Sequence, residues 1–170
     1  MKILAIDPGN IETGWCLVDS KTYKPEAFGK WLNEQLETLI TTTDGVDHFV
    51  IEEIRNYGSL MGQSVLDTCV QIGRFQKCIE QHYTELMDED AKSRWSSVPR
   101  KTYITDLTND PKSKDANIIQ YLIDRFAQNT TNRGKGTKKK PGWFYGFYKD
   151  VWQAYAIAVW YCDKINNEVF

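Results

Sequence analysis

The sequence is poor in the residues that build disulfides, zinc sites and membrane spans. Its 170 residues include four cysteines and two histidines, and no two cysteines have CxxC spacing. A zinc site is therefore not expected, and the cysteines are expected to be reduced residues of the core. Apolar runs fall far short of the roughly 20 residues that a membrane-spanning helix needs. Asp7 interrupts the first apolar stretch, as a secretory signal would not, so we expect a cytoplasmic protein.

The chain also lacks a net positive charge. Lysine and arginine number 21 against 23 aspartates and glutamates, for a formal net charge of -2. The molecule as a whole is therefore not a basic nucleic-acid binder, and any DNA surface must be a local patch. A length of 170 residues, with 41% hydrophobic and 26% charged residues, suits one globular domain spanning residues 1–170.

Hydrophobic patterning predicts an α/β architecture. Short apolar runs bounded by turn residues predict strands over residues 2–6, 14–18, 26–31, 49–51 and 98–104. The close spacing of the first three indicates an antiparallel meander. Apolar residues at helical spacing predict helices over residues 32–40, 59–83 and 114–126, and a last helix that begins near 149 or 150 and ends near 164. The polar segment 128–142 is expected to be mobile.

Three acidic residues stand where apolar segments end or begin. Asp7 follows the first predicted strand, Glu52 follows the fourth, and Asp150 lies near the start of the last predicted helix. A carboxylate at the end of a buried strand is costly unless something compensates it. A turn would explain Asp7, solvent would explain Glu52, and a helix cap would explain Asp150.

Taken together, these acids predict a metal centre. Magnesium prefers oxygen ligands, and three carboxylates can hold two ions about 4 Å apart. One ion would activate a water for attack on phosphorus, and the other would stabilise the leaving oxygen. Glu53, whose side chain alternates to the other face of its strand, is expected to be a surface residue or a support for the ligands.

The same segments resemble the RuvC-type Holliday-junction resolvases of the ribonuclease H-like superfamily. The resemblance is carried by the opening MKILAIDPG with TGW just after it, by VIEE at 50–53, by GQS and GR on the following helix, and by KDVWQAYAIA at 149–158. The order of the motifs fits across nearly the whole chain. The segment GTKKKPG at 136–142, with KDVW after it, resembles phage-borne members most closely.

This resemblance implies a fold, an activity and partners. It implies a mixed five-stranded sheet, antiparallel in its first three strands, with helices on both faces. It implies a homodimeric endonuclease of DNA recombination and repair that uses two Mg²⁺ or Mn²⁺ ions per active site. The products of junction cleavage would carry 5′-phosphate and 3′-hydroxyl ends, and a phage enzyme would act in the cytoplasm of a bacterial host. Forks and flaps are further candidate substrates of such an enzyme.

One position departs from the family pattern. Many bacterial members carry a second acidic or histidine ligand one helical turn into the last motif, where this chain has Gln153. A glutamine offers a neutral carbonyl oxygen and no charge. The metal would then be held by Asp7, Glu52 and Asp150 alone, with a weaker second ion, unless Glu53 compensates.

Two groups of basic residues are candidates for DNA contacts. The larger group lies within eight residues and consists of Arg133, Lys135, Lys138, Lys139 and Lys140. Such a run suits phosphate contacts, which are salt-sensitive and largely independent of sequence. A solvated flexible loop is the alternative. Lys112 and Lys114 stand at a predicted helix start, where the resembling family supplies further basic contacts.

Residues after the Glu52 strand are candidates for contacts with the cut strand. Arg55 and Tyr57 lie there, and the aromatic ring of Tyr57 could stack on a base. Further aromatic candidates are Tyr145, Phe147 and Tyr148, although core packing is the commoner role of such residues. The predicted helix 59–83 has an apolar face that fits either a dimer contact or a wholly buried core helix.

Two other functions compete with a nuclease. Asp7-Pro8-Gly9 with Gly14 also resembles the first phosphate loop of actin-like ATPases, but those proteins need a second glycine-rich loop and usually a longer chain. A non-catalytic junction-binding module with a decayed site is the other alternative, and Gln153 is its only support. ATP hydrolysis and junction cleavage separate the three.

Overall fold

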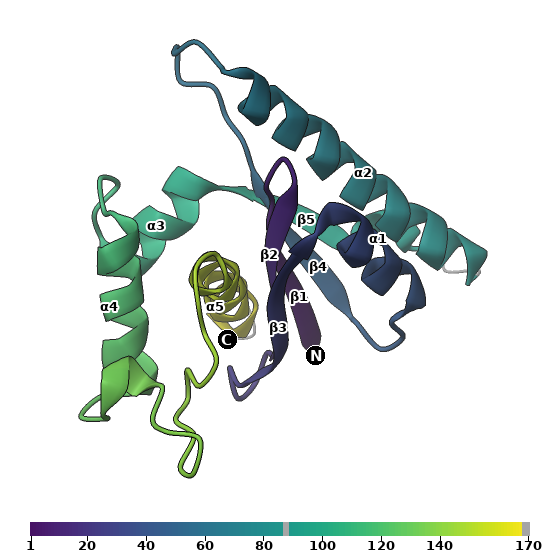
Figure 1. Ribbon diagram of the computed structural model, residues 1–170. Helices are drawn as coiled ribbons and strands as arrows, with labels where there is room; N and C mark the ends of the chain where they lie inside the picture. Colours follow the sequence, from purple (N-terminus) through teal and green to yellow (C-terminus); the bar gives the residue numbers. More distant parts are fainter. Residues whose placement is uncertain (87–88, 168–170) are drawn as a thin grey trace.

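Five strands form one mixed sheet in a computed structural model that describes residues 1–86 and 89–167 (Figure 1). The strands are β1 (Lys2–Asp7), β2 (Glu12–Asp19), β3 (Pro25–Leu32), β4 (His48–Glu53) and β5 (Trp95–Pro99). Their order is β3-β2-β1-β4-β5. The first three are antiparallel neighbours, whereas β4 runs parallel to β1 and β5 parallel to β4. The predicted meander and the mixed sheet are confirmed.

Helices cover both faces of this sheet. The α-helices of the described residues are α1 (Asn33–Thr42), α2 (Gln63–Glu85), α3 (Arg100–Thr108), α4 (Asp115–Phe126) and α5 (Val151–Asn167). One core, built with α1 and α2, takes alternate residues such as Leu4 and Ile6 of β1. The other core, built with α3, α4 and α5, contains Ile3 and Ala5, which alternate with Leu4 and Ile6 along β1. Because strand side chains alternate in direction, each strand feeds both cores.

The α5 helix lies directly on the sheet against β1 and β2. Every residue from Val151 to Val159 is buried, and all but Gln153 are apolar or aromatic, as expected of an interior helix. Alanines at 154, 156 and 158 keep its surface low enough for close contact with the strands. The predicted last helix is confirmed.

Two predicted elements are corrected. The expected strand 98–104 is wrong, because β5 ends at Pro99 and α3 begins at Arg100. Tyr103, Ile104 and Leu107 are buried together at helical spacing, which a strand could not achieve. The expected helix 59–83 begins later, at Gln63, and it is not wholly buried, since Leu66 and Val70 are exposed.

The cysteines divide between the core and the surface. All four are free, and Cys16 and Cys162 are buried as expected. Cys69 is exposed and Cys78 partly buried, so the expectation of core cysteines is wrong for Cys69. The reason is its place on the outer face of α2. Among the described residues, no helix combines the length and apolar character of a membrane span.

The lysine-rich segment after α4 folds back on itself. A short 3-10 turn, η2 (Asn132–Gly134), is followed by a bridge between Gly136 and Pro141. Gly134 has a φ of +77°, and a Cβ there would lie 2.6 Å from that of Ala127. A glycine is therefore needed where this loop packs on the C-terminal cap of α4.

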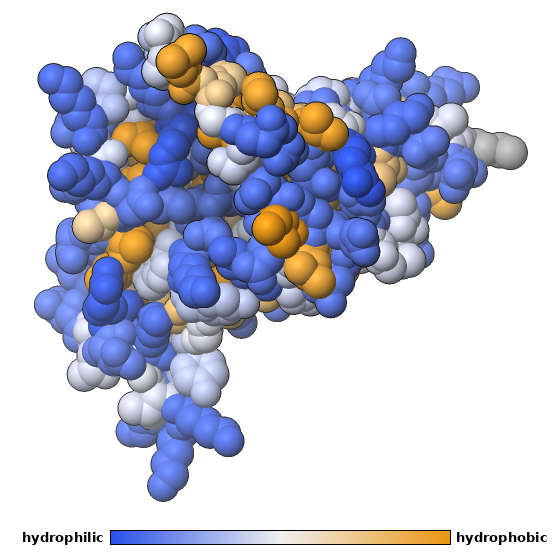
Figure 2. Space-filling view, turned by 45° about the horizontal axis from the view of Figure 1, so that its top comes forward, coloured by the Kyte–Doolittle hydropathy of each residue, from blue (hydrophilic) through white to orange (hydrophobic). Residues whose placement is uncertain are grey.

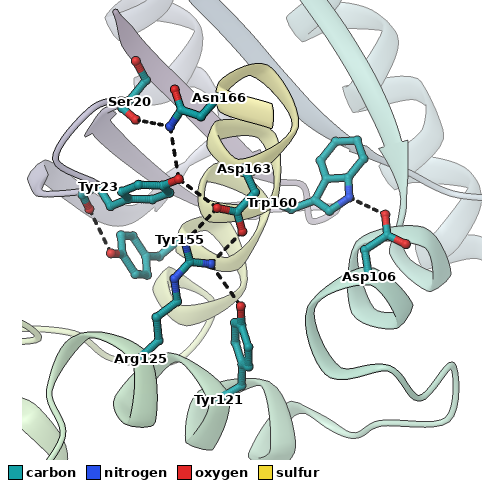
Figure 3. Close-up of polar contacts among 9 residues, drawn as sticks. All are labelled: Ser20, Tyr23, Asp106, Tyr121, Arg125, Tyr155, Trp160, Asp163 and Asn166. Atoms are coloured by element: carbon teal, nitrogen blue, oxygen red, sulfur yellow. Dashed lines mark hydrogen bonds and ion pairs between the residues drawn. The ribbon is translucent and has the colours of Figure 1, made fainter. Parts of the chain in front are cut away.

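A polar network anchors the C-terminal part of α5 (Figure 3). Arg125 of α4 donates hydrogen bonds of 2.6 and 2.7 Å to the two carboxylate oxygens of Asp163. The Tyr23 hydroxyl donates to the same carboxylate at 2.8 Å. Nearby, the indole of Trp160 donates to Asp106 of α3 at 2.7 Å. Bonds to ionised groups are the stronger kind, so this network ties α3, α4 and the β2–β3 turn to α5.

Candidate active site

Strand register places Asp7 and Glu52 side by side. The parallel pairing of β1 with β4 sets Ala5 opposite Val50, and both side chains belong to the core under α5. Asp7 and Glu52 lie two residues further along their strands, so they point to the same face at the carboxyl ends of neighbouring strands. The Glu52 side chain is 13% exposed and Asp7 is partly buried.

A glycine brings Asp150 to the same place. Gly14 of β2 pairs with Asp7. A Cβ on Gly14 would lie 2.8 Å from both the Cβ and the carbonyl oxygen of Asp150. No larger residue at position 14 would let the start of α5 approach the sheet so closely. The structure therefore brings the three predicted acids together from β1, β4 and the residue before α5.

The cluster is electrostatically strained. Burial raises the pKa of Asp7 well above its ordinary value, and the charges of Glu52 and Asp150 raise it further. Burial also raises the pKa of Glu52, against the opposing effect of hydrogen bonds from Tyr103 and Arg100. Within residues 1–86 and 89–167, no hydrogen bond or ion pair reaches the Asp7 carboxylate. A bound cation would relieve this repulsion.

Protein cations and donors hold the other two carboxylates. Asp150 lies 2.8 Å from the ammonium of Lys30. Glu52 accepts a hydrogen bond of 2.7 Å from Tyr103, with Arg100 at 3.5 Å. In this arrangement, no group of three or more Asp, Glu, His or Cys side chains in the described part of the chain is set to hold a metal ion.

The chemistry of the donors nevertheless suits a hard cation. All three acids offer carboxylate oxygens, the ligands that Mg²⁺ and Mn²⁺ prefer. Asp7, between the other two, is already free of protein partners among the described residues. Glu52 would turn from Tyr103 to share an ion with it, and Asp150 would reach an ion only by leaving Lys30.

The two secondary ligand candidates lie differently. Glu53 points to the opposite face, where its carboxylate accepts bonds from Arg55 at 2.8 Å and from the Ser97 hydroxyl at 3.2 Å. Gln153 is 6% exposed, and its side-chain oxygen lies 3.5 Å from the Tyr103 hydroxyl. Gln153 is thus next to the cluster, whereas Glu53 faces away from Asp7.

Sequence reasoning missed three residues that contact the acids. Lys30 contacts Asp150, and both Arg100 and Tyr103 contact Glu52. Arg100 and Tyr103 were missed because residues 98–104 were predicted to be a strand. In a strand they would point to opposite faces, whereas a helix brings positions i and i+3 to one face. Arg100 also forms an ion pair with Asp115, the first residue of α4.

A groove of about 310 Å³ opens beside Glu52. Its lining includes Arg55 and Tyr57 from the loop after β4, and Lys101 from α3. Tyr57 is 68% exposed, and the Lys101 ammonium lies 5.7 Å from the centroid of its ring. The predicted contacts Arg55 and Tyr57 therefore lie next to the acidic cluster.

The remaining DNA candidates lie at opposite ends of α4. Lys112 and Lys114 are exposed in the turn before α4, near the Arg100–Asp115 pair. The loop that carries Arg133, Lys135, Lys138, Lys139 and Lys140 packs on the other end of the helix. With 12 residues in α4, the two groups are separated by about 18 Å along its axis.

The aromatic candidates after this loop also separate. Phe147 is 1% exposed and packs in the core, so it is not available for stacking on a base. Tyr145 and Tyr148 are partly exposed. The Tyr148 hydroxyl accepts a hydrogen bond of 3.1 Å from the main-chain nitrogen of Lys30.

Comparison with solved structures identifies the fold. The structure of RuvC from Thermus thermophilus has a TM-score of 0.65 and 12% identity, covering 99% of this chain and 97% of that one. The structure of T. thermophilus RuvC in complex with a Holliday junction substrate also has a TM-score of 0.65, with 11% identity over 99% and 96% of the two chains. No family model and no curated protein matches the sequence. The likeness therefore concerns the fold, and the described part of the chain has the fold of these RuvC structures over nearly its whole length.

Proposed function

We propose that the protein is a divalent-metal-dependent endonuclease that resolves Holliday junctions and related branched DNA. One observation carries the proposal: Asp7, Glu52 and Asp150 converge at one end of the sheet. The likeness to a RuvC structure that holds a Holliday junction substrate supports this choice of DNA. The proposed substrate would be met in the cytoplasm of a bacterial cell.

The three acids would hold the catalytic ions. Two Mg²⁺ or Mn²⁺ ions would supply an activated water and stabilise the leaving oxygen, so that the products carry 5′-phosphate and 3′-hydroxyl ends. Asp7 would contribute to holding both ions, since it lies between Glu52 and Asp150. Arg100, which already contacts Glu52, would bind the phosphate being cut.

DNA would approach along the groove beside Glu52. Arg55 and Lys101 offer charge to the backbone there, and Tyr57 offers an exposed ring on which a base can stack. Lys112 and Lys114 would extend this surface over the start of α4. The distant basic loop would contact an arm of the junction away from the cut.

The exposed face of α2 supports the proposed homodimer. Apolar residues gather along α2 near the top of Figure 2, on a surface that is otherwise mostly hydrophilic. Leu66 and Val70 are exposed on α2, and Leu60 is exposed in the loop just before it. Sedimentation of wild type should give a dimer, and Val70→Lys should give a monomer. Gln81→Lys, an exposed change elsewhere on the helix, serves as the control.

Cleavage of synthetic DNA tests the activity. Wild type and Asp7→Asn are incubated with a four-way junction, a fork and a linear duplex in Mg²⁺. The proposal expects nicking of the junction and fork far above the duplex, and none by Asp7→Asn. Equal rates on all three substrates would remove structure specificity. Binding without nicking, in Mn²⁺ as well, would establish the non-catalytic module, and ATP hydrolysis without nicking would favour the actin-like ATPase.

A further inference from the structure

Lys30 places an ammonium group within the carboxylate cluster. It lies on β3 opposite Gly14, which is itself opposite Asp7 on β1. Its nitrogen is 2.8 Å from Asp150 and 3.5 Å from Glu12, and the side chain is 19% exposed. The shorter distance makes Asp150 the main partner of Lys30.

The position of Lys30 is held by its main chain as well. The main-chain nitrogen of Lys30 donates a hydrogen bond to the hydroxyl of Tyr148, two residues before Asp150. The strand and the segment entering α5 are thus joined twice, once through the main chain and once through the ammonium. This double link keeps the ammonium beside Asp150.

The charge balance of the cluster then leaves room for one divalent ion. Asp7, Glu52 and Asp150 carry three negative charges when ionised, and Gln153 adds none. Arg100 lies closer to Asp115 than to Glu52, which is 3.5 Å away, so Asp115 is its main partner. Lys30 reduces the net charge of the three acids to two negative charges, which one Mg²⁺ or Mn²⁺ neutralises.

We propose that Lys30 is a positioning residue that occupies the second cation position of the site. The free protein then binds one divalent ion tightly, on Asp7 and Glu52, while the ammonium holds Asp150 in place of a second ion. This inference rests on the metal site of the proposed function, and it replaces one of the two ions in the DNA-free protein by a fixed charge of the chain.

Counting Mn²⁺ ions on the DNA-free protein tests the proposal. Electron paramagnetic resonance or calorimetric titration should find one tight ion on wild type. Lys30→Met, which keeps the length of the side chain and removes its charge, should bind a second ion, or bind Mn²⁺ at least about tenfold more tightly. Lys30→Arg should behave as wild type. Lys24→Met is the matched control, because Lys24 is an exposed lysine just before the same strand.

Three results would overturn the inference. They are two equally tight ions on wild type, no difference between Lys30→Met and Lys24→Met, and no Mn²⁺ binding at all. Lys30→Gln keeps a hydrogen-bond donor for Asp150, and it replaces Lys30→Met in the titration if that variant does not fold. Because the titration contains no DNA, its outcome is separate from the cleavage assay. A wild type that binds one ion but never nicks DNA would overturn the nuclease proposal and leave the role of Lys30 intact.

Discussion

The carboxylates at the two ends of the core under α5 differ in their hydrogen-bond partners. Near the C-terminal end of α5, Asp163 receives two bonds from Arg125 and one from Tyr23. At the other end, no described residue bonds or pairs with the Asp7 carboxylate, and two further acids raise its pKa beyond the effect of burial. An aspartate carboxylate therefore stabilises the fold at position 163, whereas at position 7 its burial and the neighbouring charges destabilise its ionised form.

This contrast separates structure from function in physical terms. A carboxylate that has a planar guanidinium partner is satisfied and needs no further ligand. A carboxylate that is buried among other acids persists only if something outside the chain, such as a cation, later compensates it. The difference lies in partners rather than in residue type.

The largest expected effect comes from removing the unpartnered acid. Asp7→Asn should reduce junction cleavage on the order of 10³-fold or more, because loss of a metal ligand removes several kcal/mol of transition-state stabilisation. Its free energy of unfolding without metal should be equal to or above that of wild type, since the change relieves repulsion. Cleavage assays and denaturant unfolding in EDTA measure the two effects. A large loss of stability would show that Asp7 is a structural residue.

Removing the well-partnered acid should lower stability and leave cleavage unchanged. Asp163→Asn should lower the free energy of unfolding by about 2 kcal/mol, because it weakens charge-assisted hydrogen bonds that are mostly buried. Below the unfolding transition, junction cleavage should stay near the wild-type rate. Denaturant unfolding and cleavage at low temperature check this. A variant that folds normally but no longer cuts would contradict the division between the two ends.

The basic loop tests whether function is confined to the acidic end of the core, because it would bind DNA near the end that holds Asp163. Changing Lys138, Lys139 and Lys140 together to Ala should weaken junction binding and reduce its salt slope by roughly 0.9 for each lost phosphate contact. The loop lies about 18 Å from the start of α4, or about five base pairs of DNA. Junctions with shorter arms should therefore bind the variant and wild type equally well.

A control for the loop comes from the other basic group. Lys112→Ala with Lys114→Ala should weaken binding to short-armed and long-armed junctions alike, because these residues lie near the acidic end of α4. Binding at several salt concentrations measures both variants. If arm length makes no difference to the loop variant, the loop does not contact a junction arm.

The smallest effect concerns the pH dependence of stability. The pKa of Asp7 is raised in the folded protein, so its contribution favours folding below the unfolded pKa and is lost as pH rises through the folded value. Without metal, the stability of Asp7→Asn relative to wild type should therefore improve as pH rises from about 4 to 8. Saturating Mg²⁺ should reverse the difference at high pH, since only wild type would gain binding energy. A pH-independent difference in EDTA would show that Asp7 has an unperturbed pKa.

Local sequence pattern was enough for the elements that carry the acids. The runs that became β1 and β4 are short, apolar and ended by a carboxylate, and the stretch after Asp150 is apolar apart from Gln153. The pattern failed at residues 98–104, where the apolar residues that α3 buries are also compatible with a strand. Such ambiguity is expected for short apolar runs, since the environment rather than propensity decides between helix and strand.

The tertiary structure decided which residues contact each acid. The sequence by itself determined that Asp7, Glu52 and Asp150 stand at the ends of buried segments. Whether they meet depended on the register of β1 with β4 and on the close approach that Gly14 permits. The contact of Lys30 with Asp150, and the separation of the basic loop from the acids by the length of α4, come from packing between segments far apart in the chain. Residue type and local period are properties of a few neighbouring positions, whereas the charge that faces a given carboxylate is a property of the whole fold.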